Sequence, residues 1–304
     1  MLSAVPMIDT SLLDSFATFG ETKNFTRAAR LLGVSQPALF ERIQKLSGQV
    51  GLTLYERKGR DLVLTADGLR VLVLAREVRE RLRAFSAELA GSPSRSRVTL
   101  AAGEGSYLYL LGPGIAAFTK ASSARVDLLT TGAKATVEAL RSGEAELGVA
   151  VLDLVPHGIE AEDLARTPLC VAMPAKHALV GKRGLTLRDL RADRLVLTPE
   201  GQTHRELVSR AFSRGGERLE SPLEADGWPL MLKFVELGLG IAVVNGICDL
   251  PKGVVRRPLA ELGTVTYRLL KRRGVVLSEE ARLLAEKLRA GVRTIPGASR
   301  MTRV

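Results

Sequence analysis

The sequence has few of the residues that build metal sites and disulfides. It contains two cysteines and three histidines in 304 residues. Cys170 and Cys248 lie far apart without neighbouring cysteines, so we interpret them as buried, reduced thiols. The histidines, His157, His177 and His204, share no metal-ligand spacing with each other or with the cysteines. The sequence therefore predicts no metal site.

Catalytic and nucleotide-binding motifs are also missing. Gly238-Leu-Gly240 is not a dinucleotide fingerprint, because Val243 stands where the third glycine is needed. The sequence has no Gly-x-x-x-x-Gly-Lys-Ser/Thr loop, and Ser106 is followed by Tyr107 and Leu108 instead of the glycine pattern of a hydrolase elbow. We therefore predict no catalytic residue and no cofactor.

Long hydrophobic runs are absent too. The longest apolar stretch, Leu237 to Cys248, is too short and too rich in glycine to span a bilayer. The first residues, Met1 to Met7, lack the basic segment and apolar run of a secretory signal. We expect a cytoplasmic protein that does not contact a membrane.

The chain has an excess of positive charge. Lysine and arginine total 44 against 33 aspartate and glutamate, which gives a formal net charge of +11. This balance favours an anionic partner, although charge alone does not choose between nucleic acid and acidic lipid. The 304 residues are 46% hydrophobic and 25% charged, which indicates two or three compact units with ordinary cores.

Two short amphipathic patterns meet at a glycine turn near residue 33. Apolar residues repeat at helical spacing on both sides of the turn, at Phe25, Ala28, Ala29 and Leu32 and then at Leu39, Ile43 and Leu46. Gly33 can adopt the positive φ that ends a helix, and Ser35 is a suitable N-cap for the next one. This pattern predicts a helix-turn-helix, which can present its second helix to a DNA major groove. A helical hairpin unrelated to DNA is the alternative.

The flanking segments extend this pattern to a small domain. Upstream, a helical face that can complete a three-helix core is formed by Leu12, Leu13, Phe16 and Phe19. Downstream, residues 52–65 form two short apolar runs around Gly59, and the basic residues at the tip are Arg57, Lys58 and Arg60. We expect a β-hairpin wing whose cations reach a phosphate backbone or minor groove, with a solvated turn as the alternative.

The N-terminal part resembles the winged helix-turn-helix of LysR-type transcriptional regulators. Matching residues include Phe25-Thr26, Ala28-Ala29, Val34-Ser35-Gln36-Pro37-Ala38-Leu39, Leu54-Tyr55-Glu56-Arg57 and Leu64-Thr65. The sequence departs from the family at Phe40 and Glu41, where a serine and a basic residue are usual, so base contacts at these positions stay open. Arg42 is a substitute cation by position. The DNA-binding residues that we expect are Thr26, Arg27, Ser35, Gln36, Pro37, Ala38, Arg42, Arg57, Lys58 and Arg60.

Residues 66–90 contain no proline and carry a heptad pattern. Apolar residues alternate at spacings of four and three, at Val71, Ala75, Val78, Leu82, Phe85 and Leu89. This spacing is typical of a coiled coil, and an isolated helix of this length is marginally stable. We predict a dimerisation helix, which the family resemblance also implies. A single helix packed on its own domain is the alternative.

The polar segment Gly91 to Arg97 contains a proline and predicts a domain boundary. Beyond it, strands are expected at residues 98–102, 126–129, 147–151, 169–173, 195–197, 241–244 and 265–270. Helices are expected at residues 134–141, 279–290 and 108–119, the last interrupted near Gly112-Pro113-Gly114. Such alternation predicts parallel α/β sheets.

This half also resembles the LysR effector domain, on residues 140–149, 173–179 and 235–242. The resemblance implies two α/β lobes like those of a periplasmic binding protein. We therefore expect an α/β protein with an N-terminal winged helix-turn-helix rich in α-helix (1–65), a linker helix (66–92) and an effector-binding domain (93–304). Its lobes are expected at residues 98–167 with 268–304 and at 168–267.

Ligands of open α/β sheets bind beyond the carboxyl ends of strands, often against helix N-termini. Residues 103–106, 130–134 and 198–204 fit this position. The effector-binding residues that we expect are Gly105, Ser106, Thr131, Lys134, Thr198, Gln202, Thr203 and His204. Lys134 favours an anionic metabolite, whereas ordinary helix capping by the hydroxyl residues is the alternative.

The favoured function is a regulator that binds double-stranded DNA as a dimer or tetramer and responds to a small-molecule effector. One alternative is an α/β enzyme or small-molecule carrier with an auxiliary basic DNA-binding module. The other is a DNA-binding protein that needs no ligand.

Overall fold

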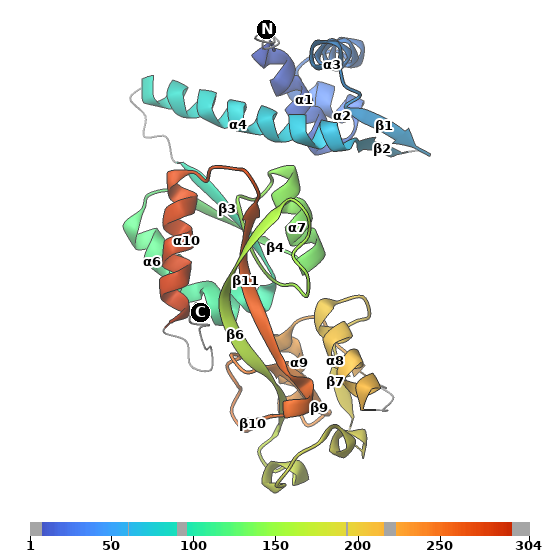
Figure 1. Cartoon of the computed structure of the whole chain (residues 1–304), viewed down its shortest axis with the longest axis vertical. Helices are drawn as coiled ribbons and strands as arrows, with labels where there is room; N and C mark the ends of the chain where they lie inside the picture. The colour runs from blue at the N-terminus through green and yellow to red at the C-terminus, as the bar shows by residue number, and fades with distance from the viewer. Residues whose placement is uncertain (1–7, 60, 90–95, 193, 216–222, 294–304) are drawn as a thin grey trace. The chain divides into compact units, whose positions relative to one another are not determined.

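The structure is a computed structural model that describes residues 8–59, 61–89, 96–192, 194–215 and 223–293 (Figure 1). The chain divides into two compact units. One contains residues 1–96 and 141–144, and the other contains residues 97–140 and 145–304.

The first unit contains the predicted helix-turn-helix. Its helices are α1 (Thr10–Thr22), α2 (Phe25–Leu32) and α3 (Gln36–Val50). The Ser35 side chain accepts a hydrogen bond from the backbone N–H of Ala38, and Gly33 ends α2 with a φ of 66°. Both predicted helix signals are therefore confirmed. The apolar faces also form one core as predicted, because it buries Leu12, Leu13, Phe16, Phe19, Ala28, Ala29, Leu39, Ile43 and Leu46.

A two-stranded wing and a long helix complete this unit. Strands β1 (Tyr55–Lys58) and β2 (Asp61–Leu64) pair antiparallel, which confirms the predicted hairpin. Gly59 has a φ of 64°, the left-handed conformation that the tight turn requires. Helix α4 (Ala66–Leu89) follows and buries Val71, Leu72 and Ala75 in the core of the same unit.

The second unit is built on a mixed sheet. Its strands are β3 (Arg97–Ala102), β4 (Arg125–Thr130), β5 (Leu147–Val151), β6 (Ile159–Pro174), β7 (Leu195–Leu197), β8 (Leu223–Glu224), β9 (Ile241–Asn245), β10 (Val254–Pro258) and β11 (Thr264–Arg272). In the described residues the order is β4-β3-β5-β11-β6-β9-β7-β8, with β10 also paired to β6.

The prediction of parallel sheets holds for only part of this sheet. Strand β3 pairs in parallel with β4 and β5, and β7 pairs in parallel with β8 and β9, but β11 and β6 run antiparallel to their neighbours. The reason is that β6 is 16 residues long and β11 returns along it, from Thr264 opposite Pro168 to Arg272 opposite Ile159. Figure 1 shows these two strands side by side along the length of the unit.

Helices and short helical turns cover this sheet. They are α5 (Glu104–Ser106), the π-helical turn η1 (Tyr107–Leu111), α6 (Gly112–Ala121), α7 (Ala133–Ser142), α8 (Thr203–Arg214), α9 (Trp228–Glu236) and α10 (Glu279–Val292), with short 3-10 turns η2 (Ala178–Gly181), η3 (Leu187–Ala192) and η4 (Ala260–Leu262). In the described residues, none of the helices has the length and apolar character needed to cross a membrane.

The Gly112-Pro113-Gly114 segment begins a helix instead of interrupting one. The π-helical turn ends at Leu111, and α6 starts at Gly112 with proline in its first turn, where a missing N–H costs nothing. A Cβ atom on Gly114 would lie 2.7 Å from the Cα atom of Leu288. Gly114 therefore allows α6 and α10, which lie beside each other in Figure 1, to cross closely.

Candidate DNA-binding surface and effector cleft

Helix α3 has one buried and one exposed face. Leu39, Ile43 and Leu46 are fully buried, whereas Ser35, Gln36 and Pro37 at its start are exposed and Ala38 is half-buried. The Thr26 hydroxyl of α2 donates a hydrogen bond of 3.0 Å to Oε1 of Gln36. This bond fixes the Gln36 amide relative to both helices, as a base-reading side chain requires.

The positions that depart from the family have different surroundings. The Phe40 side chain is 46% exposed, and its ring lies 5.6 Å from that of Phe25. Glu41 is exposed on the same helix. Arg42 instead lies half-buried and donates a hydrogen bond of 3.3 Å to the Ser15 hydroxyl on α1. Arg42 would have to leave that bond to reach a base.

The remaining predicted DNA contacts lie on α2 and the wing. Arg27, Arg57 and Lys58 are exposed. Lys58 Nζ lies 3.2 Å from a Glu56 carboxylate oxygen, and both side chains are largely open to solvent. Such a surface pair is weak, so it does not prevent Lys58 from contacting a phosphate. Arg60 lies outside the described residues.

The heptad residues of α4 fall into two groups. Val71 and Ala75 are buried in the core of their own unit, and Val78 packs against it. Leu82, Phe85 and Leu89 are 49%, 57% and 72% exposed. The first half of the pattern thus fits the single-domain alternative, while the second half leaves an apolar stripe uncovered by the described residues of this chain.

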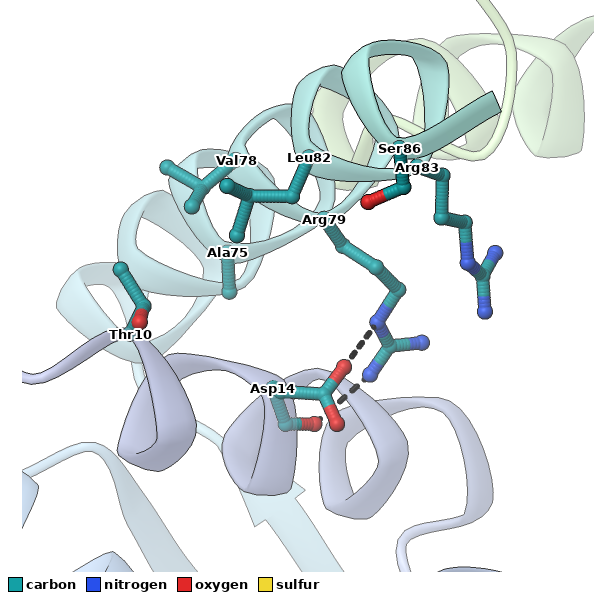
Figure 2. A pocket seen from close by; sticks show the side chains of 8 residues that line it. All are labelled: Thr10, Asp14, Ala75, Val78, Arg79, Leu82, Arg83 and Ser86. Atoms are coloured by element: carbon teal, nitrogen blue, oxygen red, sulfur yellow. Dashed lines mark hydrogen bonds and ion pairs between the residues drawn. The ribbon is translucent and has the colours of Figure 1, made fainter. Parts of the chain in front are cut away.

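A groove of about 450 Å³ runs between α1 and α4 beside this stripe. Figure 2 shows Arg79 reaching from α4 across the groove to Asp14 on α1, and the two charged groups approach to 2.7 Å. Ala75, Val78 and Leu82 line the same groove. The ion pair ties α4 to α1 near the point where the stripe becomes exposed.

The three segments that were predicted to bind an effector meet in the second unit. They line one cleft of about 850 Å³, a volume within the range of small-molecule sites. The predicted residues that line it are Gly105, Ser106, Thr131, Lys134, Thr198, Gln202, Thr203 and His204. Lining residues outside the predicted segments include Asp226, Asn245 and Tyr267, and Glu104 lies within the predicted segment 103–106 without having been singled out. Trp228 also lines it.

Buried polar atoms in this cleft lack partners among the described residues. They are the Thr198 hydroxyl, Oδ1 of Asn245 and both ring nitrogens of His204. Thr198 and Asn245 are each 2% exposed. A buried polar atom without a hydrogen bond costs about 1–3 kcal/mol, so these atoms are suited to a bound polar molecule.

Burial also controls protonation in the cleft. It lowers the pKa of His204 to about 4, so the ring is neutral at pH 7. The ring is half-buried as a whole, but neither nitrogen is accessible. Burial raises the pKa of the Tyr267 hydroxyl well above its usual range, and this hydroxyl accepts a hydrogen bond from Nδ2 of Asn245. Both groups therefore offer neutral hydrogen bonding.

Helix capping does not account for Ser106 or Thr203. Ser106 is the last residue of α5, whose N-cap is Gly103, and α8 has Gln202 as its N-cap. In the described residues neither helix start receives a side-chain capping bond. The first N–H groups of α8 are thus available beside the cleft.

Comparison with known proteins identifies a family for each of the two units. A family profile described as the LysR substrate binding domain matches residues 91–293. A second, described as the bacterial regulatory helix-turn-helix protein of the lysR family, matches residues 10–69. The chain belongs to the LysR family. Members of this family are DNA-binding transcriptional regulators with an effector-binding domain; they form oligomers and are not enzymes.

Relatives within the LysR family match most of the chain. The regulator BbuR of Bordetella bronchiseptica is 29% identical over 301 residues, 95% of this chain and 91% of BbuR. The RuBisCO operon transcriptional regulator of Allochromatium vinosum is 28% identical over 234 residues, 76% of this chain and 77% of that regulator. Among solved structures, a full-length OxyR variant from Pseudomonas aeruginosa has a TM-score of 0.70 at 21% identity, covering 98% of this chain and 99% of its own. At that identity, the likeness shows the fold.

Proposed function

We propose that this LysR-family regulator reads DNA through α3 and the wing, and that its cleft binds a small polar metabolite with an anionic group. Because its target is DNA, we place its action in the cytoplasm. The observation that carries the proposal is the set of unpartnered buried polar atoms on Thr198, His204 and Asn245, three residues that line one cleft. Lys134 and the uncapped start of α8 favour the anionic group, because both offer positive charge or free N–H groups.

The exposed stripe of α4 supports a dimer as the DNA-binding form. Three large apolar side chains on one helix are costly to leave in water, and a second copy of α4 would cover them. Sedimentation should show that Leu82→Glu dissociates the oligomer at concentrations where wild type remains associated. Leu74→Glu is the matched control, because Leu74 is 41% exposed on the same helix but lies outside the heptad. Equal behaviour of the two variants would contradict the stripe as the interface.

The effector site is tested by thermal melting of the full chain against a metabolite panel. A ligand at one hundred times its Kd stabilises the folded protein by about 2.7 kcal/mol. Ser106→Leu should abolish the shift, because Ser106 is 5% exposed at the cleft and a larger side chain would fill it. Thr119→Leu, at an exposed position on α6, should respond as wild type does. Both variants should still bind DNA without ligand. A normal response from Ser106→Leu would overturn the site.

A further inference from the structure

We propose that the effector is a small zwitterion, such as an amino acid, whose carboxylate and ammonium groups bind opposite charges of the cleft. This inference rests on the proposed function of the cleft as the effector site. It adds a cationic group to the ligand, which the family match does not indicate. Its basis is a pair of opposite charges, Lys134 and Glu104, that line the same cleft without pairing.

The positive charge lies at the start of α7. Lys134 is exposed in the first turn of that helix and forms no ion pair with any described residue. Thr131 and Ser106 line the cleft with it and offer hydroxyl donors. A carboxylate placed here would meet a cation, hydroxyl groups and the positive end of the α7 dipole.

The negative charges come from two separate segments. Glu104 begins α5, and Asp226 precedes α9. A Cβ atom on Gly227 would lie 2.6 Å from Oε2 of Glu104, so the Glu104 carboxylate lies against the backbone next to Asp226. Gly227 has a φ of 91°, which also favours glycine. Glu104 and Asp226 therefore both line the cleft, and the Glu104 carboxylate lies against the backbone that follows Asp226.

The surroundings of these carboxylates keep them available to a ligand. Glu104 lines the cleft without an ion pair to any described residue, and Asp226 accepts one hydrogen bond of 2.8 Å, from the neutral amide of Gln202. Trp228 lies directly against Gly105, since a Cβ atom there would be 2.3 Å from the indole ring. An ammonium group beside Glu104 could thus also contact an aromatic ring.

One of the unpartnered atoms of the cleft requires a hydrogen-bond donor from the ligand. Oδ1 of Asn245 is an acceptor at 2% exposure without a partner in the described part of the chain. With the Glu104 and Asp226 carboxylates it makes three acceptors in one cleft. A ligand with anionic groups alone would leave these acceptors unmatched and would face a repulsive pair of charges.

A metal ion is a weaker explanation of the two carboxylates. Among the described residues, no group of three or more histidine, cysteine, aspartate or glutamate side chains could hold a metal ion. An organic ammonium group needs no such ligand set, because two carboxylates and a carbonyl oxygen can accept all of its N–H bonds.

Titration calorimetry of the full chain with three matched series of probes tests the inference. The series are the common L-amino acids, the same compounds without the amino group, and the same compounds without the carboxylate. For the best amino acid, we expect removal of either group to weaken binding at least about tenfold, as the loss of a charge-assisted hydrogen bond implies.

Charge variants assign each group to its side of the cleft. Glu104→Gln should weaken binding of the amino acid and lower the ratio of its affinity to that of the des-amino compound. Lys134→Met should lower the ratio of the amino acid's affinity to that of the decarboxylated amine. Glu286→Gln, which removes an exposed carboxylate on α10 away from the cleft, should change neither ratio.

The outcomes separate this inference from the proposed function. If des-amino acids bind wild type as tightly as amino acids do, or if Glu104→Gln leaves the ratio unchanged, the zwitterion is wrong while the cleft stands. None of these compounds need bind for the melting panel to identify a ligand of wild type. If that ligand has no cationic group and Ser106→Leu abolishes its effect, the zwitterion is again wrong while the cleft stands. If no compound binds in either experiment, the effector cleft itself fails, and this inference fails with it.

Discussion

The DNA-binding unit and the effector cleft differ in how their polar groups are matched. In the first unit, the side chains of Asp9, Asn24 and Ser35 cap the starts of α1, α2 and α3. The buried Ser15 hydroxyl donates to the backbone carbonyl of Ser11 and accepts from Arg42. In the cleft, by contrast, buried atoms of Thr198, His204 and Asn245 have no partner in the described residues.

The two regions therefore differ in whether their polar groups need an outside partner to form hydrogen bonds. The helix-turn-helix satisfies its internal hydrogen bonds with its own side chains, so it presents a finished surface to DNA. The cleft carries unmatched groups that a ligand can satisfy, and ligand binding can therefore change its stability strongly.

The largest effect is expected in the core of the DNA-binding unit. Phe19 is fully buried, and its ring lies 4.3 Å from that of Phe25 and 5.2 Å from that of Tyr55. Phe19→Ala should lower the free energy of unfolding of this unit by about 3–5 kcal/mol, because the cavity cannot be refilled. Hydrogen exchange of α1 and α3 in the full chain would measure the loss.

The control for this change is Leu31→Ala. Leu31 is 66% exposed on α2, so its truncation should change stability by less than about 0.5 kcal/mol. If both variants lose the same unfolding free energy, the aromatic cluster around Phe19 does not form the stabilising core of this unit.

The next effect concerns DNA discrimination by α3. If Gln36 reads a base, Gln36→Ala should reduce the preference for a selected site over random duplex by about 1–3 kcal/mol. Thr26→Val should reduce it less, because it removes the 3.0 Å bond that orients the Gln36 amide but leaves that amide in place. Lys58→Ala should weaken both duplexes about equally and lower the salt dependence. Fluorescence anisotropy at several salt concentrations measures all three.

The DNA prediction has a clear contrary result. An unchanged preference in Gln36→Ala, together with wild-type affinity in Lys58→Ala, would remove α3 and the wing from the DNA surface. The matched polar groups of the first unit would then serve stability alone.

A smaller effect is expected from acid in the effector unit. The folded-state pKa of His204 is lowered to about 4, below its value of about 6.5 in an unfolded chain. The unfolded chain therefore binds the proton first, and stability that is complete above pH 6.5 is lost as pH falls toward 4. Between pH 6.5 and 5 this loss is at most about 2 kcal/mol.

Urea unfolding followed by the fluorescence of Trp228, the single tryptophan of the sequence, measures the loss. His204→Gln should flatten the pH dependence in this window, whereas His157→Gln, at an exposed position, should not. Equal pH profiles for wild type and His204→Gln would show that His204 is as accessible to protons in the folded unit as in the unfolded chain.

Much of the first unit could be predicted from the sequence because the signals that determine it are local. Gly33, Ser35 and the apolar repeats on α2 and α3 act within a few residues, and the structure bears out each of them. The heptad was harder to interpret, because spacing alone does not say that Val71 and Ala75 face their own core while Leu82 and Phe85 are exposed. Arg42 likewise turns toward Ser15, a contact across 27 residues.

Only part of the cleft could be predicted from the sequence, and the reason is physical. Glycine-hydroxyl segments after strands indicated Ser106, Thr131 and Thr203, and the structure brings these segments together. Asn245 and Tyr267 reach the same cleft through the antiparallel course of β6, β9 and β11, which strand-helix alternation did not indicate. Asp226 lies outside the predicted segments, and Glu104 lies inside one without a signal of its own; the fold brings both to the cleft lining.

The smallest effect gives the sharpest test of the comparison. Thr198→Val keeps the shape of the side chain and removes a buried hydroxyl that lacks a partner in the described residues. Because no hydrogen bond is lost, the ligand-free protein should gain about 1 kcal/mol of unfolding free energy, while its thermal response to effector falls. Thr136→Val is the matched control, since the Thr136 hydroxyl is fully buried and donates a 3.1 Å bond to the Gly132 carbonyl. That variant should lose about 1 kcal/mol, so the two substitutions are expected to have opposite signs. Urea unfolding of both variants would measure this, and a loss of stability in Thr198→Val as large as that in Thr136→Val would mean that the cleft hydroxyl is already satisfied without a ligand.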